Sequence, residues 1–167
     1  MIEPTLKAMR DLGTPYQGIL YAGVMIKNNY AKLVEYNVRF GDPECQVLVL
    51  RLRSDIVELI LGTIDGNIHK VHADWNNNHV ATVVMASNGY PGEYKKGTII
   101  RSLKTTDDLE NIEVFHAGTE FKNNEVLAVG GRVLSITSSD RDLKSALENI
   151  YSAINTIDWT ESTYRKD

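Results

Sequence analysis

The stretch AKLVEYNVRFGDPECQ, residues 31–46, constrains the fold most, because it starts with a strand pattern and ends with a helix-start pattern. Alternate side chains of a strand point to opposite faces, which divides the strand part into two sets. The first set is apolar and is predicted to face a core: Val34, Tyr36, Val38 and Phe40. The second set places a carboxylate, an amide and a guanidinium in one row: Leu33, Glu35, Asn37 and Arg39. These polar groups either face bulk water or line a cleft that binds a ligand.

The turn that follows the strand reads as the start of a helix. Asp42 is a favoured N-cap residue, Pro43 suits the first helical position, and Glu44 suits the positive end of the helix dipole. Capping alone would account for Asp42. A second interpretation is that a helix N-terminus beside Arg39 forms an anion site.

The pattern before residue 31 predicts a short helix and a strand that pairs with the opening stretch. The helix ends near Gly13 and is expected to bury a stripe of Leu6, Met9 and Leu12. Residues 18–26 form an apolar strand, expected to be covered on both faces, and Asn28-Asn29 form a hairpin turn. A helix from Cys45 is expected to break near Ser54-Asp55, where a second helix begins.

Beyond residues 66–76 the chain changes to short strands and polar turns, which predicts a boundary there. Strands are expected over residues 80–87, 98–103 and 112–119 and in the segment 125–139, and a turn-rich loop covers residues 88–97. A helix then follows Asp140, with a predicted buried stripe of Leu143, Leu147, Ile150 and Ile154. We therefore expect an α+β fold that ends in a small β-rich domain with one packed helix.

Composition excludes several classes of protein. The net charge of -4 and the absence of a Lys/Arg cluster argue against a nucleic-acid-binding surface. The single Cys45 excludes an internal disulfide and fits a reducing compartment. No apolar run has the length of a membrane span and no signal-peptide pattern begins the chain, so we expect a soluble, cytoplasmic protein with no membrane partner.

The polar row is the best candidate for chemistry. Glu35 and Asn37 both offer oxygen, which Mg²⁺ prefers, and Arg39 can pair with phosphate in a bidentate way. His116 fits a structural role, since no Ser-His-Asp or Cys-His arrangement is present, and a zinc site among the other histidines lacks thiolate ligands. The GYPG loop at residues 89–92 lacks the ending of a P-loop.

At EYNVRFGDPECQ the sequence closely resembles the glycinamide ribonucleotide synthetase family, the phosphoribosylamine–glycine ligases of the ATP-grasp superfamily. The resemblance continues in the same order through GILYAGVMI, RLRSDIVEL, ASNGYPGEYKKG, VFHAGT, GGRVLSIT and TYRKD. It thus covers essentially the whole chain.

The resemblance implies a function for the polar row. Members use ATP as co-substrate to phosphorylate glycine, and the amine of 5-phosphoribosylamine attacks the acyl phosphate, giving glycinamide ribonucleotide, ADP and phosphate. Glu35 and Asn37 match the family's Mg²⁺ or Mn²⁺ ligands, and Arg39 matches a residue near ATP and the acyl phosphate. Asp42 lies where the motif approaches the substrate.

The resemblance also implies that part of the enzyme is missing. Members of the family are more than twice this length, so residues 1–72 would be the C-terminal part of the ATP-grasp domain and residues 73–167 the C-terminal domain. We expect this chain to be inactive without an N-terminal half. The alternatives are a non-catalytic remnant, a partner-binding half of a split ligase, or another ATP-grasp carboxylate–amine ligase, which the GDPE turn and GYPG loop disfavour.

Overall fold

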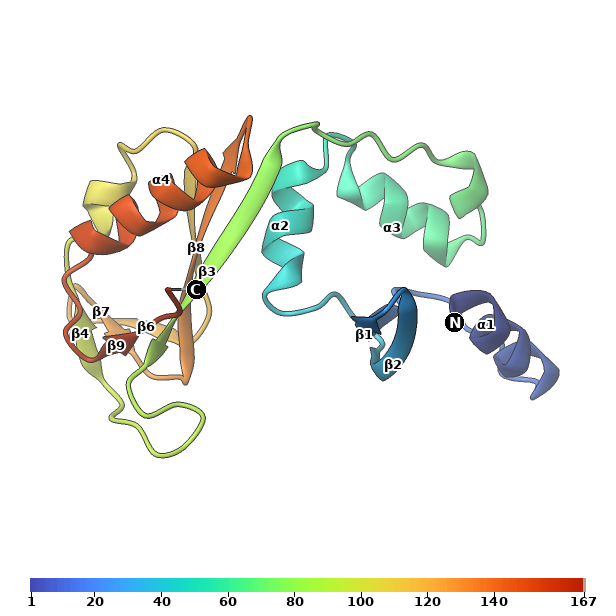
Figure 1. Ribbon diagram of the computed structural model, residues 1–167, viewed down its shortest axis with the longest axis horizontal. Helices are drawn as coiled ribbons and strands as arrows, with labels where there is room; N and C mark the ends of the chain where they lie inside the picture. Colours follow the sequence, from blue (N-terminus) through green and yellow to red (C-terminus); the bar gives the residue numbers. More distant parts are fainter. Residues whose placement is uncertain (167) are drawn as a thin grey trace. The chain divides into compact units, whose positions relative to one another are not determined.

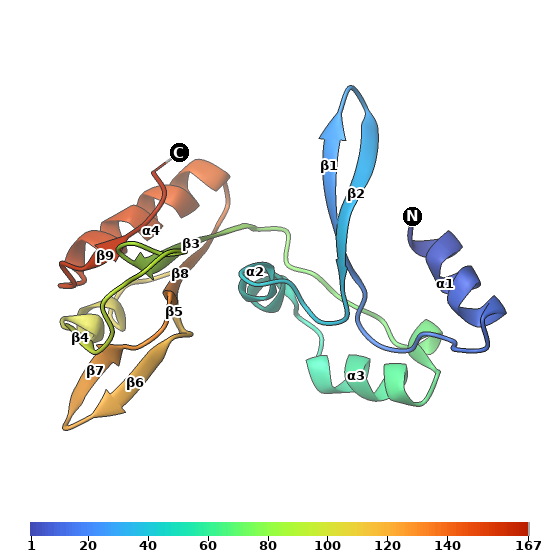
Figure 2. The same cartoon turned by 90° about the horizontal axis from the view of Figure 1, so that it is seen from below.

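The computed structural model describes residues 1–166, and their contacts divide them into two compact units. The first unit comprises residues 1–45 and 52–75, and the second comprises residues 46–51 together with the described residues from 76 onward. Figures 1 and 2 label the helices and strands of both units. The first unit contains α1 (Ile2–Asp11), β1 (Tyr21–Lys27), β2 (Tyr30–Asn37), α3 (Ile56–Ile64) and the 3₁₀ helix η1 (Ile68–Lys70). Helix α2 (Glu44–Arg51) begins in the first unit, and its residues from Gln46 onward cluster with the second.

Strands β1 and β2 form the antiparallel hairpin that the sequence predicts (Figure 2). Asn28 and Asn29 take φ values of 51° and 63° at its turn, a left-handed conformation that Asn tolerates. Gly23 pairs with Glu35 and Val24 pairs with Leu33, which leaves Val34 as an extra residue in β2. This bulge interrupts the strict alternation of side chains, so Leu33 does not continue the row of Glu35 and Asn37.

The expected core face of β2 is not buried within this unit. Val34 is 66% exposed and Val38 is 74% exposed, and Met25 and Ile26 of β1 are exposed as well. The sheet that contains these residues has two strands among the residues described, and two strands cannot bury their own faces. The prediction of covered faces from these residues is therefore wrong for the unit as described.

The helices of the first unit begin and end close to the predicted signals. Gly13 has a φ of 77° just after α1, while Leu12, predicted to be buried, is largely exposed. Asp55 caps α3 by accepting a 2.8 Å hydrogen bond from the backbone N–H of Val57, which confirms the predicted second helix. Helix α2 begins at Glu44, so Pro43 precedes the helix rather than occupying its first position.

The second unit is built from antiparallel strands. Its four-stranded sheet has the order β5-β8-β3-β9, and a three-stranded sheet has the order β4-β7-β6. The strands are β3 (His79–Ser87), β4 (Thr98–Ile100), β5 (Ile112–His116), β6 (Thr119–Lys122), β7 (Glu125–Ala128), β8 (Arg132–Asp140) and β9 (Ser162–Thr163). The 3₁₀ helix η2 (Leu103–Thr106) follows β4. The positive φ values of Asn123 and Asn124 confirm the predicted turn between β6 and β7.

Helix α4 (Leu143–Thr156) packs on the four-stranded sheet, where it contacts β3 and β8 (Figure 1). Asp142 caps it, accepting a 2.9 Å hydrogen bond from the backbone N–H of Ser145. The residues of α4 that the core buries are Ala146, Ile150, Ala153 and Ile154. Leu143 is half-exposed, so the predicted stripe is correct for the two isoleucines and wrong for Leu143. The small side chains of the alanines allow α4 to approach the sheet closely. The prediction considered only leucine and isoleucine residues and did not indicate this.

Candidate functional site

The side chains of Glu35 and Asn37 meet at the end of β2. The Asn37 amide Nδ2 donates a 2.9 Å hydrogen bond to Glu35 Oε1. The Glu35 side chain is exposed and Asn37 is partly buried. The pair therefore presents polar groups side by side on one accessible face of the hairpin.

Arg39 lies beyond the end of the strand. Strand β2 ends at Asn37, and the Arg39 guanidinium turns back to donate a 2.7 Å hydrogen bond from Nη1 to the backbone carbonyl of Phe40. The residue is exposed. The row expected from the sequence thus consists of two strand positions followed by a guanidinium in the segment that leads to α2.

Two further residues belong to this site, and the sequence did not single them out as site residues. Tyr21 of β1 pairs in register with Asn37, and its hydroxyl donates a 3.1 Å hydrogen bond to Glu44 Oε1 at the start of α2. This hydrogen bond and the charge of Glu44 raise the pKa of Tyr21 above its ordinary value of 10.0, with smaller contributions from burial and Glu35, while Arg39 opposes the rise. The hydroxyl therefore stays protonated near neutral pH and acts as a donor.

The hairpin bulge explains why the sequence did not indicate Tyr21 as a residue of the candidate site. Counting back from the turn at Asn28-Asn29 without a bulge pairs Tyr21 with Tyr36 and places it away from Glu35. The extra residue Val34 shifts the register by one, which brings Tyr21 opposite Asn37. The local sequence does not indicate the bulge, because valine is a common residue in regular strands.

Asp42 and Cys45 flank the start of α2. Asp42 is exposed, and the backbone N–H of Cys45 donates a 2.9 Å hydrogen bond to the Gly41 carbonyl. Burial raises the pKa of the Cys45 thiol, and the charge of Asp42 raises it further. The thiol is thus protonated at neutral pH, which agrees with the absence of a predicted role for it as a nucleophile.

The donor set of Glu35 and Asn37 fits a hard divalent cation that takes its remaining ligands from phosphate and water. The Asn37 amide now directs its nitrogen at Glu35, so binding a cation requires it to present Oδ1 instead. Among residues 1–166, no group of three or more His, Cys, Asp and Glu side chains could hold a metal by itself. Glu35 and Asn37 are therefore suited to supply part of the ligands of a cation, with phosphate and water supplying the rest.

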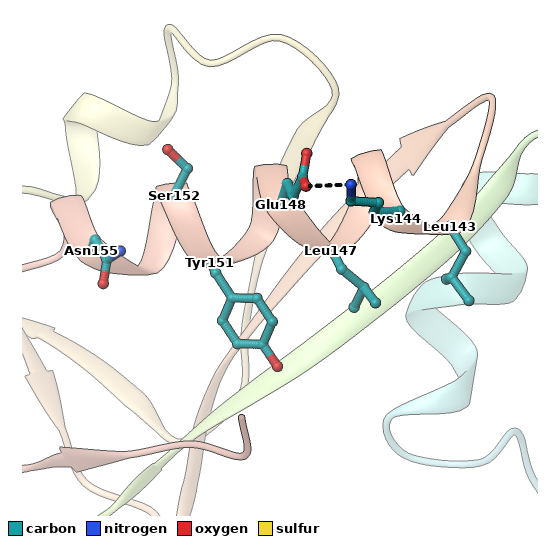
Figure 3. A pocket seen from close by; sticks show the side chains of 7 residues that line it. All are labelled: Leu143, Lys144, Leu147, Glu148, Tyr151, Ser152 and Asn155. Carbon is teal, nitrogen blue, oxygen red and sulfur yellow. Dashed lines mark ion pairs between the residues drawn. The ribbon is translucent and has the colours of Figure 1, made fainter. Parts of the chain in front are cut away.

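Two other surface features of the described chain lie in the second unit. A hollow of about 730 Å³ runs along α4, where Leu147 and Tyr151 point to the same side and Lys144 pairs with Glu148 at 3.6 Å (Figure 3). One helix supplies all of its lining residues. His116 is exposed, and its Nδ1 lies 3.0 Å from Thr119 Oγ1. No helix in residues 1–166 is long and apolar enough to cross a membrane.

Comparison with known proteins covers both units. The family described as phosphoribosylglycinamide synthetase, C domain, matches residues 80–167, and the one described as phosphoribosylglycinamide synthetase, ATP-grasp (A) domain, matches residues 1–45. Phosphoribosylamine–glycine ligase of Brucella melitensis is 46% identical over 167 residues, covering 100% of this chain and 39% of that protein. The human trifunctional purine biosynthetic protein adenosine-3 is 47% identical over 168 residues, covering 100% of this chain and 16% of that protein.

A solved structure is similar as well. The crystal structure of phosphoribosylamine–glycine ligase from Thermotoga maritima superposes with a TM-score of 0.82 at 30% identity, covering 98% of this chain and 40% of that one. The chain thus spans about two fifths of the length of the single-function bacterial ligases that it matches.

Proposed function

We propose, from the premise that this chain belongs to the phosphoribosylglycinamide synthetase family, that it supplies the C-terminal part of an ATP-dependent phosphoribosylamine–glycine ligase. The observation that carries the proposal is the meeting of Glu35 and Asn37 at the end of β2, two residues before Arg39 in the segment that leads to α2. Phosphoryl transfer depends on positioning and charge neutralisation more than on a covalent protein group, and this arrangement provides both.

Each residue takes a distinct part in the proposed reaction. Glu35 and Asn37 would hold the divalent cation, Mg²⁺ or Mn²⁺, with Asn37 contributing its amide oxygen. The cation neutralises phosphate oxygens of ATP when bound. Arg39 binds the transferred phosphoryl group through its planar guanidinium, and Asp42 lies where the motif approaches the substrate. The amine of phosphoribosylamine then displaces phosphate from the activated glycine.

The exposed apolar residues of the hairpin indicate that this chain works only together with the remaining part of the ligase. Met25, Ile26 and Val34 are each more than half exposed on a sheet of two strands. Exposed apolar surface and unpaired strand edges are features of surfaces that bind another polypeptide segment. We therefore expect turnover only when the residues that complete the relatives are joined to this chain or added to it.

The test compares ADP release by this chain alone with release by the chain plus the part that its relatives carry beyond the match, each with and without glycine and phosphoribosylamine. We expect substrate-dependent release only in the combined sample, and loss on the order of 100-fold or more in Glu35→Ala. Lys32→Ala, an exposed change on the same strand, is the matched control and should retain activity. Broadening of NMR signals by Mn²⁺ near residues 35–37 provides a second readout, which Glu35→Ala should abolish. Unchanged metal-dependent kinetics in Glu35→Ala would refute the assignment.

A further inference from the structure

The carboxylate of Glu44, at the start of α2, has a hydrogen-bond partner on another element. Its Oε1 accepts the 3.1 Å hydrogen bond from the Tyr21 hydroxyl, which joins the first turn of α2 to strand β1. Because Tyr21 pairs with Asn37, the ring stands on the same face of the hairpin as the proposed cation ligands. Glu44 is thereby tied to the site by a contact between two different elements.

Gly41 lies against both this carboxylate and the ring of Tyr21. A Cβ atom at Gly41 would overlap Glu44 Oε2 and would lie 3.1 Å from Tyr21 Cε2. Gly41 is itself buried, while its carbonyl accepts the backbone N–H of Cys45. The missing side chain thus lets the carboxylate and the phenol ring share one place above the turn. A contribution to the helix dipole needs neither the phenol nor the glycine.

The chemistry of the substrate indicates a use for this carboxylate. Glycine carries a carboxylate, which is activated, and an ammonium group, which requires a negatively charged partner. In the proposed function Glu35 serves the cation and Arg39 serves the phosphoryl group, which leaves the carboxylates of Asp42 and Glu44 for the ammonium group. Of these two, Glu44 is the one that the Tyr21 hydroxyl orients from another element. Glu44 is an exposed carboxylate of the same site, and a neutral phenol orients it without cancelling its charge.

We propose that Glu44 binds the ammonium group of the amino-acid substrate and that Tyr21 is a positioning residue, acting through its hydrogen bond to Glu44. This inference rests on the proposed ligase function and adds the residue that recognises the amino end of the substrate. Glu44 therefore determines specificity for an amino acid over a hydroxy acid of the same size.

The test uses the complete enzyme, meaning this chain together with the part that its relatives carry beyond the match. Glycine-dependent ADP release by the wild type is measured first and tests the ligase function by itself. Glu44→Gln should then raise the KM for glycine about 10- to 100-fold, with the KM for ATP changed less than about twofold. Tyr21→Phe should raise the KM for glycine by a smaller factor, because the charge remains and only its orientation is lost.

The matched control is Glu58→Gln, which removes an acidic residue from the first turn of another helix, α3, in the same unit. It should leave both KM values unchanged. Glycolate, which replaces the ammonium group with a hydroxyl, provides a readout that a structural role would not move. The preference of the wild type for glycine over glycolate, as a ratio of kcat/KM, should fall in Glu44→Gln and stay constant in Glu58→Gln.

Three results overturn the inference. An unchanged preference for glycine in Glu44→Gln would mean that the carboxylate does not contact the amino end. A weaker apparent affinity for Mg²⁺ with an unchanged KM for glycine would make Glu44 a metal ligand instead. A wild type without glycine-dependent ADP release would refute the ligase function, and the inference would fall with it.

Discussion

Replacing Ile150 with alanine should destabilise the second unit strongly, because this side chain is fully buried between α4 and the sheet. The change removes three carbon atoms, which at about 0.8 kcal/mol per buried methylene amounts to about 2.4 kcal/mol. A partly collapsed cavity adds to this, so we expect a loss of about 3 to 4 kcal/mol in the free energy of unfolding. Leu143→Ala on the same helix removes a side chain that is 50% exposed, and it should cost about 1 kcal/mol or less.

The assay is urea unfolding followed by tryptophan fluorescence. Trp159 is 4% exposed and belongs to the same core as Ile150, while Trp75 lies in the first unit. A Trp75→Phe background makes the signal specific for the second unit, since the chain has two tryptophans. Equal losses for Ile150→Ala and Leu143→Ala would refute the assignment of the buried face of α4.

Two further changes test a buried hydrogen bond and a helix cap. Thr98→Val removes the acceptor of the 2.9 Å hydrogen bond from Trp159 Nε1 and leaves a buried donor unpaired. The free energy of unfolding should therefore fall by about 1–3 kcal/mol. Thr98→Ser keeps the hydroxyl, and an equal loss in both variants would contradict this explanation. Hydrogen bonds from Ser145 lower the pKa of Asp142 below its ordinary value of 3.8, so its stabilising effect is complete above that pH and disappears as the pH falls through the lowered pKa. The difference in melting temperature between wild type and Asp142→Asn should therefore shrink in acid, and a constant difference would count against the cap.

The candidate site could be located from the sequence because its key residues lie within one short segment. Glu35, Asn37 and Arg39 are two residues apart, and the turn that follows them carries strong local signals. Their roles, like the boundary predicted at residues 72–73, stay predictions. Tyr21 could not be recognised, because it reaches the site only through a strand register that the bulge at Val34 changes.

The sequence by itself determined the order and type of the α-helices and of most strands, although it predicted residues 112–119 as one strand and did not indicate β9. Turn asparagines with positive φ and the aspartates that cap α3 and α4 act over a few residues, so a local sequence pattern indicates them. Tertiary structure decided which face each element buries. Leu143 fits a helical stripe as well as Ile150 does, but only the sheet under α4 selects Ile150. It also decided that Tyr21 meets Glu44, because a contact across 23 residues depends on strand pairing that no local preference encodes.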